Sequence, residues 1–289
     1  MKRTLPNALP RSNEWVATIV LQSNKQYSNE ERLDALSRIV DVVSKETEGN
    51  GVIVFPGGWF NAGAKEPRSL YEWVEKKIKD CFSRNERTII VCLGIDGSFD
   101  AEGYAHDQIA IANSKKGIEA IGRKFHPAPG EQGLVVLAND HQSKEENRLR
   151  VFEFNKVRYY MCVCYDSFGL RHQALRNPGI DVVLNLVHCF YPRGKGPSGD
   201  SYFAKYGFAG ASMQWKCPVF GAVVYFNRSI PEHWPSGVCW NQGSKSTCEW
   251  RYTDNPIKPK STVELSSKEG LVSVRIYDLD GIIRPQASI

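Results

Sequence analysis

Apolar residues recur along the chain in two rhythms, one typical of buried strands and one typical of amphipathic helices. Short, nearly continuous apolar runs rich in β-branched residues predict strands that are covered on both faces. These runs occupy residues 15–22, 51–55, 88–94, 157–164, 181–188 and 218–226. Two segments with apolar residues at helical spacing predict helices. One follows Ser28 and the other follows Ser69, and each serine has a glutamate three residues later, which is the pattern of a capping box.

The middle of the chain departs from this strand–helix alternation. Two pairs of apolar segments are separated by short turns and predict β-hairpins, 108–112 with 119–124 and 150–154 with 157–164. Strand–helix units then return, with a helix over about 201–216 and a last strand over 270–277. This order predicts an α/β fold, which we expect to be a four-layer α-β-β-α sandwich of two mixed sheets with helices outside. Outer helices of this kind often pair across a dimer, so we expect a homodimer or a higher homo-oligomer.

Composition and charge exclude several classes of protein. The formal net charge of +5 is spread among interspersed acidic residues, so no basic stripe for nucleic acid is expected. No apolar run reaches the roughly 20 residues that cross a bilayer, and no membrane association is expected. The polar start of the chain does not resemble a signal peptide. The cysteines lie mostly inside apolar runs rather than at the spacings of a disulfide framework, so we expect reduced thiols and a cytoplasmic protein.

The stretch from Met161 to Asp166 carries the clearest chemical signal. A buried strand ends at Cys164, the chain turns, and a helix begins within a few residues. Such an elbow exposes a side chain beside backbone N–H groups and can favour a thiolate. The alternative is that Cys164 is a small buried apolar side chain. Cys162 is predicted to lie in the core, and because two further ligands are missing from the pair we expect no metal site.

Several other residues are candidates for the same site. Lys124 closes the first predicted hairpin, and Glu131 follows it in a proline-broken loop. A lysine in this place is often simply solvated. His188 follows a buried strand, and Trp59 follows a break in another strand. Either could line a pocket or pack in the core.

Taken together, these segments resemble the nitrilase superfamily of carbon–nitrogen hydrolases over roughly residues 14–280. The opening strand and helix match the family pattern, and so do Arg123-Lys124 after a hairpin, the Cys164-Tyr165-Asp166 elbow and Asn227-Arg228. The resemblance implies one domain over residues 14–280, with terminal extensions at 1–13 and 281–289. It also implies a small-molecule substrate, no cofactor, and a Glu-Lys-Cys triad to which Lys124 and Cys164 belong.

One departure from the family pattern bears directly on the chemistry. Where the family has Phe-Pro-Glu, this chain has Phe55-Pro56-Gly57. The glutamate would act as general base, a contribution typically worth about 10²–10⁴-fold in rate. Glu131 is the best replacement among the carboxylates, unless it serves to orient Lys124. Asp96, at the end of a strand, is a weaker option.

Two interpretations of function therefore stay open. The first is a hydrolase that acts on an amide or a nitrile through a covalent intermediate on Cys164. Lys124 and Glu131 would complete the catalytic group, and Tyr165, His188 and Trp59 would contact the substrate. The second is a catalytically inactive nitrilase-like protein that binds a small molecule or a partner, which Gly57 favours.

Overall fold

The computed structural model describes residues 14–63, 68–82, 87–97, 106–192, 199–240, 256–267 and 270–283. The predicted terminal extension 1–13 and residues 284–289 of the other extension lie outside the described residues. Within the described part of the chain, no helix is long and apolar enough to cross a membrane.

Strands and helices alternate as the apolar pattern predicts, and the α/β class is confirmed. The strands are β1 (Trp15–Ser23), β2 (Gly51–Val54), β3 (Phe60–Asn61), β4 (Ile89–Asp96), β5 (Gln108–Ser114), β6 (Gly117–Arg123), β7 (Val151–Phe154), β8 (Val157–Val163), β9 (Val182–Phe190), β10 (Val219–Phe226), β11 (Gly237–Val238), β12 (Ser261–Ser267) and β13 (Gly270–Asp278). The helices are α1 (Asn29–Glu46), α2 (Arg68–Phe82), α3 (Asp166–His172), α4 (Gly199–Tyr202), the π-helix η1 (Phe203–Ala209) and α5 (Gly210–Trp215).

The strands form one continuous 13-stranded sheet, in the main order β6-β5-β4-β2-β1-β10-β9-β8-β7, rather than two separate sheets. The reason lies in β1. Its first four residues pair in parallel with β2 and its last four with β10, while β13 runs antiparallel to it over nearly its whole length. β1 therefore joins a half that contains β2 and β4–β6 to a half that contains β7–β10.

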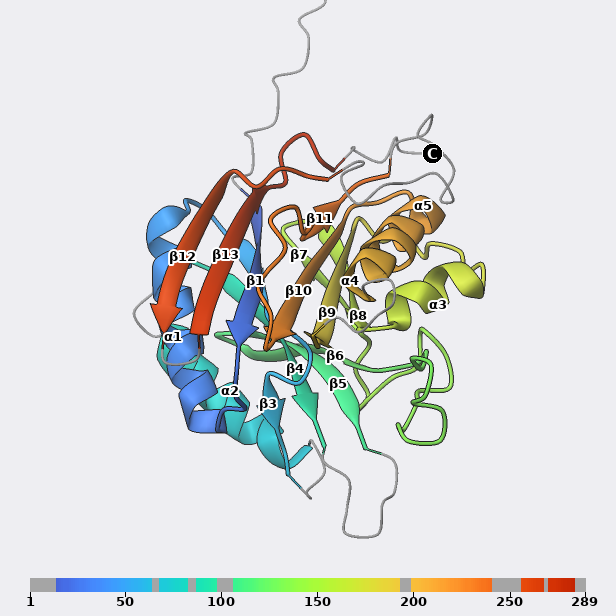
Figure 1. Cartoon of the computed structure of the whole chain (residues 1–289), viewed down its shortest axis with the longest axis horizontal. Helices are drawn as coiled ribbons and strands as arrows, with labels where there is room; N and C mark the ends of the chain where they lie inside the picture. The colour runs from blue at the N-terminus through green and yellow to red at the C-terminus, as the bar shows by residue number, and fades with distance from the viewer. Residues whose placement is uncertain are drawn as a thin grey trace, which may run out of the picture.

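Buried apolar side chains form three clusters around this sheet. The cluster that we name the inner core contains residues of both halves, among them Val54 of β2 and Leu184 of β9, and none from a helix. A second cluster packs β-strand residues against α1 and α2, and a third packs them against α3, η1 and α5. Figure 1 shows α1 and α2 on one side of the strands and α3, α4 and α5 on the opposite side.

Local sequence signals explain one helix start and miss another. The capping box of α1 is confirmed, because the Glu31 N–H donates to Ser28 Oγ at 3.2 Å and the Ser28 N–H donates to Glu31 Oε2 at 2.8 Å. In α2 the predicted cap is wrong, since the helix includes Arg68 and Ser69 therefore lies inside it. The helix predicted over 201–216 is present but its middle is π-helical.

Candidate active site

Cys164 lies on a sharp turn between β8 and α3, as the sequence predicts. Its φ of 50° is left-handed, a conformation that costs a residue other than glycine about 1–2 kcal/mol. The Cys164 N–H donates to Leu186 O of β9 at 2.9 Å, and Ser167 Oγ donates to Cys164 O at 3.3 Å. The side chain is half-buried, whereas Cys162 is fully buried as expected. The turn therefore takes the residue 164 thiol out of the core.

Asp166 fixes this elbow against the segment that carries Lys124. Its buried carboxylate accepts backbone N–H bonds from Phe125 and His126 at 2.8 and 2.9 Å. It also pairs with the buried guanidinium of Arg150 at 2.8 Å. Because these bonds join the two segments that follow β6 and β8, residues far apart in the sequence meet at one site.

Lys124 is completely buried and has two partners. Its ammonium donates to Gln108 Oε1 at 2.8 Å and to Glu131 Oε2 at 2.5 Å. Glu131 also accepts a bond from the Ala128 N–H at 2.7 Å. Burial alone would raise the pKa of Glu131, but Lys124 and these hydrogen bonds lower it below its usual range. The contacts and the lowered pKa favour an ionised Glu131 that is paired with Lys124.

His188 stands at a β-bulge in β9. Leu186 pairs with Ala222 of β10 and Cys189 pairs with Val224, so β9 has one extra residue between these pairs. A bulge of this kind re-aims the side chains that follow it. The sequence places His188 directly after a buried strand, but it does not indicate the bulge.

The packing of β9 shows that its side chains change from one face of the sheet to the other at the bulge. Before the bulge, Val182, Leu184 and Leu186 lie in the inner core. After it, the even-numbered Phe190 packs with the cluster on the α3 side. The side chains of β9 therefore exchange faces at the position of His188.

The imidazole of His188 links Cys164 to a carboxylate at the end of β4. His188 Nε2 lies 3.1 Å from Asp96 Oδ1, and both side chains keep 20% of their surface exposed. The ring also hydrogen-bonds to the Cys164 sulfur. Cys164, His188 and Asp96 thus form a linear chain of contacts.

The ionisation of the two central groups follows from these contacts. Burial would raise the pKa of the Cys164 thiol, but the hydrogen bond from His188 and the charge of Lys124 outweigh it and lower that pKa. Burial would lower the pKa of His188, but Asp96 and the Cys164 sulfur raise it to about 10. Both shifts favour a thiolate on Cys164 beside an imidazolium on His188, and the thiolate is the form in which a cysteine is nucleophilic.

The two glycines after β2, Gly57 and Gly58, leave room for the side chains of His188 and Asp96. A Cβ on Gly57 would lie 2.8 Å from two ring atoms of His188 and 2.9 Å from the backbone oxygen of Leu186. Gly58 has a φ of 59°, and a Cβ there would lie 2.6 Å from Asp96 Oδ2. A side chain at position 57 and the observed position of His188 exclude each other.

Tyr165 and Trp59 differ in their access to the site. Tyr165 is half-buried beside Cys164 and stacks on Phe168 at a centroid distance of 4.5 Å. Burial, followed by the Cys164 charge, raises the pKa of Tyr165 to about 12. Trp59 is 1% exposed and packs against Phe55 at 4.7 Å and under the Arg32 guanidinium. Trp59 therefore packs in the core, the second of the two roles open to it.

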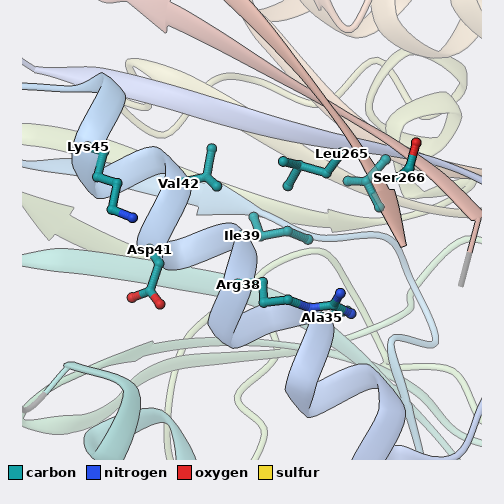
Figure 2. Close-up of a pocket in the computed structure, with 9 residues that line it drawn as sticks. Ala35, Arg38, Ile39, Asp41, Val42, Lys45, Leu265 and Ser266 are labelled. Atoms are coloured by element: carbon teal, nitrogen blue, oxygen red, sulfur yellow. The ribbon is translucent and has the colours of Figure 1, made fainter. Parts of the chain in front are cut away.

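A hollow on another part of the surface does not belong to this site. It lies between α1 and the β12–β13 hairpin, and Figure 2 shows Ala35, Ile39 and Val42 of the helix facing Leu265. None of these elements contributes Cys164, Lys124, Glu131, His188 or Asp96.

Comparisons with known proteins find structural neighbours of this chain, but no match to its sequence. No family model matches the chain, and a search of curated proteins finds no match. Among solved structures, an amidase from Nesterenkonia sp. AN1 superposes with a TM-score of 0.55 at 13% identity, covering 97% of both chains. A variant of this amidase is described as a member of the nitrilase superfamily.

A second neighbour comes from another organism. The carbon–nitrogen hydrolase of Helicobacter pylori G27 superposes with a TM-score of 0.55 at 12% identity, covering 93% of this chain and 91% of that one. At such identities the likeness is one of fold. The chain thus has a mixed α/β fold whose structural neighbours are nitrilase-superfamily amidases and a carbon–nitrogen hydrolase.

Proposed function

We propose that this protein is a carbon–nitrogen hydrolase that cleaves an amide of a small molecule through a covalent intermediate on Cys164. The observation that carries the proposal is the state of the Cys164 sulfur. It is held on a left-handed turn, hydrogen-bonded by His188 and close enough to Lys124 for the lysine charge to lower its pKa. A partly buried thiol in such surroundings has the features of a nucleophile rather than of a packing residue.

The charged groups suit acyl transfer. The thiolate would attack the amide carbon, and the carbonyl oxygen would become an oxyanion. Lys124, buried and fixed by Gln108 and Glu131, would stabilise that oxyanion together with the backbone N–H that follows Cys164. Tyr165 would contact the substrate beside the sulfur. No metal or organic cofactor is required for these steps.

The fold supports the same proposal. The three apolar clusters suit an α-β-β-α order of layers, with the inner core between the two halves of the sheet. In a glutamate-to-glutamine mutant of the Nesterenkonia amidase, acrylamide undergoes Michael addition at the active-site cysteine, and the acetamide moiety of fluoroacetamide is added there. We therefore propose that both reagents attach to Cys164.

The test combines labelling with turnover. Acrylamide and fluoroacetamide are incubated with the protein at pH 6.5, and the labelled cysteine is found by peptide mass spectrometry. A panel of small aliphatic amides is assayed for ammonia release. Cys164→Ala should abolish both signals. Cys81→Ala is the matched control, because Cys81 is a half-buried thiol whose pKa is raised by burial.

The outcomes separate the two functional interpretations. Labelling of Cys164 with ammonia release that Cys81→Ala retains supports the hydrolase. Saturable binding of an amide without any turnover, together with an unreactive Cys164, would instead support an inactive binding protein.

A further inference from the structure

We propose that His188 is the general base that takes the proton of Cys164, and that Asp96 is the residue that positions it. This inference rests on the proposed function and explains how the chemistry proceeds with a glycine at position 57. Three features of the structure carry it: the space around Gly57, the direction of the imidazole ring, and the charged and titratable groups around the ring and Cys164.

The first feature is steric. Gly57 leaves no room for a side chain, because His188 ring atoms lie 2.8 Å from where its Cβ would be. Asp96 likewise fills the space beside Gly58. The imidazole thus lies where the resemblance puts a glutamate, and the base moves from the end of β2 to β9.

The second feature is the direction of the ring. The one-residue bulge in β9 turns the side chains at the end of that strand. Nε2 of the ring faces Asp96, at 3.1 Å. With Nε2 engaged by Asp96, we assign Nδ1 to the hydrogen bond with the Cys164 sulfur, and the Asp96 carboxylate holds the ring in this orientation. The contact of a carboxylate, an imidazole and a nucleophile in series is the arrangement by which triads orient a base.

The third feature is the set of charged and titratable neighbours. Those that face the pair are Asp96 at the end of β4, Lys124 after β6, Tyr165 at the start of α3 and Cys189 in β9. Glu131 is already engaged by Lys124 and Gln108. The imidazole thus contacts the Cys164 sulfur and is held by Asp96, and these contacts suit proton transfer.

The proton and electron pairs balance as follows. Nδ1 of His188 takes the thiol proton, the sulfur bonds to the amide carbon, and the carbonyl electron pair moves to oxygen. The tetrahedral species collapses as the C–N bond breaks, and Nδ1 gives its proton to the leaving amine. Water then attacks the thioester carbon and gives a proton to Nδ1. The C–S bond breaks, the sulfur leaves as thiolate, and the net reaction is amide plus water to acid plus amine.

The experiment measures thiol reactivity without any substrate. The rate of Cys164 alkylation by iodoacetamide is followed from pH 5.5 to 9.5 in the wild type, His188→Gln and Asp96→Asn. His172→Gln is the control, because His172 is an exposed histidine at the end of α3. Circular dichroism and thermal melting establish that each variant is folded.

In the wild type and His172→Gln, we expect the alkylation rate to stay high well below the ordinary thiol pKa of ~8.5. In His188→Gln the profile should rise only near that value, with a rate at pH 6 about tenfold lower. Asp96→Asn should shift the profile in the same direction by a smaller amount, in a protein that is still folded. A shifted profile is a signature that a purely structural role for Asp96 does not produce.

Four outcomes decide between these assignments. A wild-type profile with an ordinary thiol pKa overturns the assignment, and so does a His188→Gln profile that matches the wild type. A His188-dependent profile in a protein that hydrolyses no amide supports the assignment of the base and refutes the hydrolase. Ammonia release that persists in His188→Gln refutes the base while leaving the hydrolase standing.

Discussion

Placing one methyl group on Gly57 tests the arrangement of the site most directly. In Gly57→Ala the new Cβ would lie 2.8 Å from the His188 ring and 2.9 Å from a backbone oxygen of β9. The backbone oxygen belongs to a central strand, so the imidazole is the group that has to move. Overpacking of this kind usually costs about 1–3 kcal/mol of unfolding free energy.

The chemical effect of this change can be worked out from the thiol. A thiol of ordinary pKa ~8.5 is about 0.3% ionised at pH 6, whereas a thiolate paired with an imidazolium is largely ionised. A thiolate of lower pKa is intrinsically less nucleophilic, which offsets part of the gain. Displacing the ring should therefore slow alkylation of Cys164 at pH 6 by about tenfold.

Two assays check these magnitudes. Iodoacetamide kinetics at pH 6 report the thiol, and urea denaturation reports the unfolding free energy. Gly199→Ala is the control, because a Cβ on Gly199 meets no atom of the residues that the structure describes within 4 Å. If Gly57→Ala reacts at the wild-type rate and with the wild-type pH profile, the reasoning about the His188 position is refuted.

A carboxylate at position 57 sharpens the same test. Gly57→Glu alone should lower Cys164 reactivity, since the longer side chain collides with His188. The double variant Gly57→Glu with His188→Gly removes that collision and brings back a base. It should turn over an amide faster than either single variant, and a double variant slower than both would contradict the exchange of one base for the other.

Three further predictions concern neighbouring groups. Burial lowers the pKa of His188, but Asp96 and the Cys164 sulfur together raise it from 6.5 to about 10. The stability that the protonated imidazole contributes is therefore present below pH 6.5 and is lost as the pH rises through 10. Asp96→Asn should therefore lower the unfolding free energy at pH 6 but hardly at pH 10.5, as urea titrations at both values will reveal. Asp166→Asn removes one partner of the buried ion pair with Arg150 and should lower the unfolding free energy by about 3–5 kcal/mol, as measured by chemical denaturation. A loss below about 1 kcal/mol would contradict the inference that Asp166 fixes the elbow. Glu131→Gln should lower kcat for an amide by less than tenfold, because it keeps an oxygen for Lys124, whereas a general base would cost about 10²–10⁴-fold.

Much of the fold could be predicted because its central strands are continuous apolar runs. β1, β2, β4, β9 and β10 lie within a few residues of their predicted positions. The joining of the two halves into one sheet could not be predicted, because it depends on β1 pairing with β2, β10 and β13 at once. Those partners are remote in the sequence, and no local pattern encodes their order.

The candidate site likewise has some contacts that local sequence predicts and others that it does not. The elbow at Cys164 follows from a strand, a turn and a helix in close succession, so local sequence is enough to predict it. The contact between Lys124 and Glu131 follows from their proximity in one loop. The link from His188 to Asp96 spans 92 positions and depends on the bulge against β10, which only the folded sheet sets.

The bulge in β9 has a consequence for how proteins of this kind are found. On the proposed assignment of His188 as the base, one added residue in a strand re-aims a histidine and gives the cysteine a partner other than the glutamate of the family pattern. A search that demands a glutamate after the second strand would discard such chains as inactive. The more informative marker is a pair of small residues after that strand, combined with a histidine at the end of the strand beside the cysteine.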